Sequence, residues 1–66
     1  MHDEVSSDDK MKYIENSIFK LPTKNKSKVR GNFQRIKILT DKGMVVSADR
    51  LRDDTYSYIR KQLLKH

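Results

Sequence analysis

Apolar residues recur at a helical spacing in the first third of the chain. The members of this series lie three or four residues apart, as a period of 3.6 requires: Met11, Ile14, Ile18 and Leu21. Ser7, followed by Asp8 and Asp9, is typical of a helix start. Pro22 follows and stops the pattern. The sequence therefore predicts an amphipathic helix from about residue 8 to residue 20, preceded by a disordered stretch over residues 1–6.

The pattern then loses its apolar members. Thr23 to Lys28 alternates lysine with small polar residues, so this stretch offers nothing to a core. Residues 22–30 are predicted to form a solvated, basic linker.

Two strand-like runs come next. Phe33 to Thr40 and Met44 to Ser47 flank Asp41-Lys42-Gly43, which places glycine where a three-residue hairpin loop needs a positive φ. The resulting ribbon would direct one set of alternate side chains to the core: Ile36, Ile38, Met44 and Val46.

A helical spacing returns near the end of the chain. Its apolar stripe contains Leu51, Thr55, Ile59 and Leu63, and the helix is expected to begin at Ser47 or Asp49, or alternatively at Asp53-Asp54. The whole pattern predicts an α+β fold, in which a single small domain (residues 1–66) consists of an N-terminal helix, a two-stranded antiparallel β-hairpin and a C-terminal helix.

The charged residues are unevenly distributed along the chain. The chain of 66 residues has a formal net charge of +6, and 36% of its residues are charged. Residues 20–42 hold eight lysines and arginines against Asp41 alone, whereas residues 1–19 hold five acids against two lysines. A local concentration of positive charge favours a polyanionic partner. The acidic first segment would repel nucleic acid if it folded beside the basic one.

Residue types that would support catalysis are sparse. The two histidines are His2 and His66 at the chain ends, no cysteine is present, and no serine lies in a nucleophile elbow. Two glycines cannot form a phosphate-binding loop. We therefore expect no enzyme activity, catalytic residue, cofactor or metal site. No apolar run approaches a membrane span and no secretory pattern opens the chain, so the expected location is the cytoplasm.

The predicted interface is a track of alternating cations that continues onto the outer side of the hairpin. In an extended segment, residues two apart project from one edge, where they can follow phosphates. Phe33 adds a surface on which an unpaired base can stack. The predicted nucleic-acid-binding residues are Lys24, Lys26, Lys28, Arg30, Phe33, Arg35, Lys37 and Lys42.

These features favour a small regulatory nucleic-acid-binding protein, with DNA preferred to RNA. By composition alone it is comparable to accessory proteins of bacteria or phages that regulate transcription. The alternative is a protein interaction module that binds an acidic partner protein without binding nucleic acid. In the interpretation without a binding role, the lysines only keep the protein in solution and Phe33 belongs to the core. The small core and the open strand edges also predict a homodimer.

Overall fold

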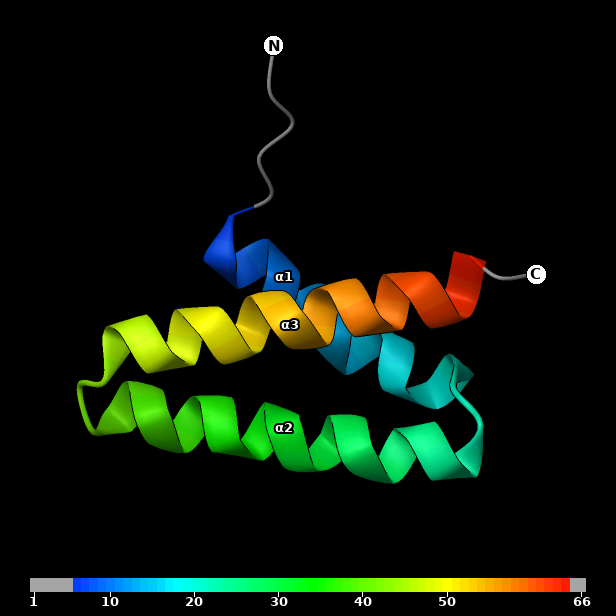
Figure 1. The fold of residues 1–66 in the computed structure, drawn as a ribbon, viewed down its shortest axis with the longest axis horizontal. Helices are drawn as coiled ribbons and strands as arrows, with labels where there is room; N and C mark the ends of the chain where they lie inside the picture. Colours follow the sequence, from blue (N-terminus) through cyan, green and yellow to red (C-terminus); the bar gives the residue numbers. More distant parts are fainter. Residues whose placement is uncertain (1–5, 65–66) are drawn as a thin grey trace, which may run out of the picture.

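Three helices make up the part of the chain that the structure, a computed structural model, describes, which is residues 6–64. They are α1 (Ser7–Ser17), extended by a 3-10 turn η1 (Ile18–Lys20), α2 (Thr23–Asp41) and α3 (Val45–Leu64). Helices α2 and α3 lie side by side and antiparallel, and α1 crosses behind them, mainly against α3 (Figure 1). The fold is an all-helical bundle.

The predicted β-hairpin is wrong, because the residues assigned to its strands are helical and residues 6–64 contain no strand. Ile36 fits both patterns, and it is fully buried. Ile38 lies two residues further on, which is about 200° around a helix, and it is 53% exposed. Val46, predicted to face the core, is 74% exposed. The α+β class is therefore replaced by a helical class.

The first predicted helix is confirmed with small changes at its ends. Ser6 caps α1, where its Oγ accepts a hydrogen bond of 3.2 Å from the backbone N–H of Asp9. The helix tightens into η1, and Leu21 is extended. Of the stretch predicted to be disordered, residues 1–5 lie outside the described residues.

The predicted linker at residues 22–30 is also wrong, because it forms the first half of α2. Pro22 occupies the N-cap position with a φ of −61°. The lysines and arginine that follow have high helix propensity, and Val29 is fully buried. One buried valine together with good helix formers thus anchors a segment that otherwise has no apolar residue.

The turn between α2 and α3 coincides with the predicted hairpin loop. Gly43 has a φ of +80°, as expected, and its N–H donates to the carbonyl oxygen of Thr40 at 3.0 Å. Met44 donates from its N–H to Leu39 at 2.9 Å. The positive φ was correctly predicted, but it joins two helices, and α3 begins at Val45.

The core lies where the three helices meet. Its buried apolar members come from every element: Ile14, Ile18, Leu21, Val29, Ile36, Ala48 and Ile59. Polar contacts tie α1 to α3, since Lys10 pairs with Asp53 at 2.5 Å and the guanidinium of Arg52 donates to Ser7 at 3.1 Å. None of the helices described over residues 6–64 has the length and apolar character needed to cross a membrane.

Candidate functional site

The cations of α2 form two rows rather than one track. Residues two apart, such as Lys24 and Lys26, point about 200° apart around a helix. Residues four and seven apart point in similar directions. One row therefore contains Lys24, Lys28 and Arg35, and the other contains Lys26, Arg30 and Lys37. The single edge predicted from an extended chain does not exist.

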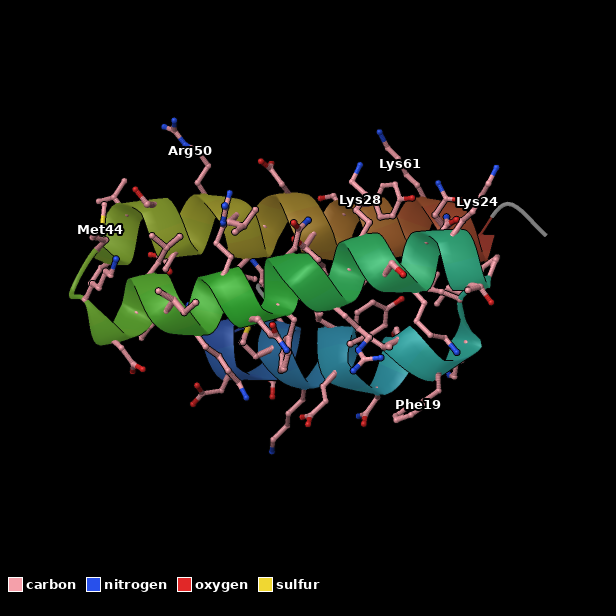
Figure 2. All side chains as sticks on the ribbon, turned by 90° about the horizontal axis from the view of Figure 1, so that it is seen from below. Phe19, Lys24, Lys28, Met44, Arg50 and Lys61 are labelled. Carbon is pink, nitrogen blue, oxygen red and sulfur yellow. The ribbon has the colours of Figure 1, made fainter. Side chains whose placement is uncertain are left out.

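The first row lies beside α3. Lys28 Nζ is 4.8 Å from the centroid of the Tyr58 ring, which places this row at the contact between the two helices. Figure 2 shows Lys24, Lys28, Arg50 and Lys61 projecting from the same side of the molecule, away from α1. We call these four residues, together with Arg35, the basic face.

Most acidic side chains lie away from the basic face or are paired. Asp49 forms an ion pair with Arg52, and Asp53 pairs with Lys10 of α1. Asp54 lies within about 40° of Arg50 and Lys61 around α3, so it is a carboxylate of this face. The five positive charges of the basic face therefore clearly exceed the negative charge of Asp54.

The described part of the acidic first segment, residues 6–19, does not pack against the basic face. Its described acids, Asp8, Asp9 and Glu15, belong to α1, which lies on the other side of the α2–α3 pair (Figure 2). For these three acids, the packing of α1 avoids the repulsion of nucleic acid that would arise if they lay beside the basic face.

The second row borders a groove of about 490 Å³ between α2 and the end of α1 with η1. Its apolar walls are Ile18, Phe19 and Phe33, and its polar lining is Glu15, Lys26, Arg30, Gln34 and Lys37. We call it the aromatic groove. Phe19 is 81% exposed, whereas Phe33 is partly buried and carries Lys37 Nζ at 4.8 Å from its ring centroid.

The structure divides the predicted site residues among three places. The basic face receives Lys24, Lys28 and Arg35, and the aromatic groove receives Lys26, Arg30, Phe33 and Lys37. Lys42 caps the C-terminal end of α2, at the turn. Lys24 and Lys42 therefore lie at opposite ends of α2.

Several residues of both surfaces are absent from the predicted site. Arg50 and Lys61 complete the basic face from α3, and Glu15, Phe19 and Gln34 line the groove. A signal for Phe19 was present, because it falls outside the apolar stripe of the first helix and is nevertheless large and aromatic.

The described residues hold no cluster of three or more His, Asp or Glu side chains that could bind a metal ion. Comparisons with protein-family models, curated proteins and solved structures find no match for this chain. The two surfaces of α2 are therefore the features of the described residues that can indicate a function.

Proposed function

We propose that this chain is a nucleic-acid-binding protein that holds a phosphate backbone against its basic face. The observation that carries the proposal is the gathering of five cations from two helices on the side opposite α1. Phosphate contacts from lysine and arginine provide most of the affinity of non-specific nucleic-acid binding.

The dimensions of the basic face suit a duplex. Arg35 lies 11 positions after Lys24, and Lys61 lies 11 positions after Arg50, so each pair is about 16 Å apart along its helix. That length corresponds to roughly five base-pair steps of a duplex. Because α2 and α3 are antiparallel, each end of the face receives cations from both helices (Figure 1). We therefore favour DNA as the partner.

Contacts of this kind position a protein without reading bases. The proposed role is that of an accessory protein that binds DNA with little sequence preference and regulates access to it, including for transcription. The competing role is binding to an acidic protein, for which the same face would serve. Measured affinity for a DNA duplex separates the two roles.

The test measures binding of a fluorescent 20-base-pair duplex by anisotropy between about 50 and 200 mM salt. If all five cations contact phosphates, log K falls against log salt with a slope of about −4 to −5. Lys24→Gln/Lys28→Gln should flatten the slope by about two units, because two contacts are lost. Glutamine keeps the helix propensity and a long side chain.

The matched control is Lys12→Gln/Lys20→Gln, which removes the same charge from α1 and η1. It should leave the slope within about half a unit of the wild-type value, since neither lysine belongs to the basic face. Equal effects of the two double variants would contradict a localised face. Absence of binding at about 150 mM salt by a folded sample would reject nucleic acid and favour the acidic protein partner.

A further inference from the structure

The aromatic groove combines a stacking surface with an excess of positive charge. Phe19 is 81% exposed, so it contributes little to the core. Such exposure is unusual for a large aromatic side chain. Lys26 and Arg30 follow one another by a helical turn along the opposite wall, and Lys37 lies over the ring of Phe33. Its volume of about 490 Å³ falls within the usual range of small-ligand sites.

The lining matches the parts of a nucleotide one by one. An aromatic ring stacks on the face of a base, and an arginine guanidinium can do the same or bind phosphate. Carboxylate and amide side chains such as Glu15 and Gln34 pair with base edges. Three cations against one carboxylate leave a net positive charge that complements a phosphate group.

We propose that the aromatic groove binds a nucleotide, with its base against Phe19 and its phosphate between Lys26 and Arg30. This site is separate from the basic face, because the two rows of α2 cations point to opposite flanks of the helix. The nucleotide is either free or an unpaired residue of a strand, since both present the same base and phosphate.

The probe is guanosine 5′-monophosphate, whose base offers adjacent N–H donors to a carboxylate. Titration into the ¹⁵N-labelled full chain should shift the amide signals of groove residues, and inorganic phosphate at equal concentration should shift them far less. Phe19→Ala should weaken binding about tenfold, the loss expected for one stacked base. The matched control, Val46→Ala, removes another exposed apolar side chain (74% exposed) and should not change affinity.

A second pair of variants separates this site from the basic face. Lys26→Gln/Arg30→Gln should weaken nucleotide binding at least fivefold and leave the duplex salt slope unchanged. Lys24→Gln/Lys28→Gln should do the reverse. Failure of duplex binding therefore leaves the nucleotide site standing, and the converse also holds.

A single-stranded DNA hexamer that contains one guanine, at an internal position, identifies the source of the nucleotide. Binding of this hexamer at least tenfold tighter than the mononucleotide identifies a strand, whereas equal or weaker binding identifies the free nucleotide. Both results require that Phe19→Ala lowers the affinity. The proposal is overturned if Phe19→Ala binds like the wild type, or if inorganic phosphate or a hexaglutamate peptide shifts the groove signals as strongly as the nucleotide.

Discussion

The two rows of cations on α2 have equal charge and different neighbours. The row of Lys24, Lys28 and Arg35 continues across α3 into further cations, and it forms an open basic face (Figure 2). The row of Lys26, Arg30 and Lys37 borders two phenylalanines and a carboxylate in a groove. The function proposed for each row therefore follows from the surroundings that the bundle provides, because the charges themselves are the same.

The position of α1 creates this difference. It packs on one side of the α2–α3 pair, held to α3 by the Lys10–Asp53 ion pair and by the contact of Arg52 with Ser7. Its C-terminal end and η1 then supply one wall of the groove. The opposite side of the pair receives no third helix among the described residues, so its cations remain in solvent.

The two rows of cations exist only if α2 is helical in this register, and the substitution with the largest expected effect tests that register. Ile36→Ala should lower the free energy of unfolding by about 2 to 4 kcal/mol, since a fully buried side chain leaves a cavity. Ile38→Ala should change it by less than about 0.5 kcal/mol, as expected of a surface substitution. Urea denaturation followed by circular dichroism measures both. A large loss of unfolding free energy for Ile38→Ala would contradict the helical register of α2, and the division of its cations into two rows would then be wrong.

The ends of the chain were more predictable than its middle. The first helix, the last helix and the positive φ of Gly43 were correctly predicted, because caps, a clear 3.6 period and a turn glycine are local signals. Ile14 and Ile59, from the apolar stripes predicted for these two helices, are fully buried.

The structure predicted for the middle of the chain is wrong because the residues there fit both a strand period and a helix period. Alternating lysines and the pair Ile36 and Ile38 match a strand, whereas Val29, Phe33 and Ile36 match a helix at spacings of four and three. The sequence contains the second pattern, and the helix propensity of lysine and arginine supports it. The candidate site depended on this choice, since the same residues form one edge in a strand and two flanks in a helix.

Substitution of one cation in each row tests their difference by a smaller effect, on duplex affinity. Lys28→Gln should weaken duplex binding about fivefold at about 150 mM salt and flatten the salt slope by about one unit, because one phosphate contact is lost. Arg30→Gln removes the same charge two residues away, from the other row, and should leave duplex affinity within about twofold. Anisotropy titrations of the two variants in parallel measure the ratio. Equal losses would mean that both rows contact the duplex.

The smallest expected effect concerns Gly31, which follows Lys24 by seven residues and precedes Arg35 by four, so it lies in the row of the basic face. Gly31 lies in the middle of α2, and a Cβ placed on it meets no atom within 4 Å. Gly31→Ala should raise the free energy of unfolding by about 0.5 to 1 kcal/mol, because alanine restricts the unfolded chain and favours the helix. Thermal melting measures this gain, and Gly43→Ala is the control, since its φ of +80° should make the same substitution destabilising. If Gly31→Ala is instead destabilising, α2 is not a continuous helix at this position. Because the added methyl carries no charge and meets no neighbouring atom, the duplex and nucleotide affinities of Gly31→Ala should both stay within about twofold of the wild-type values.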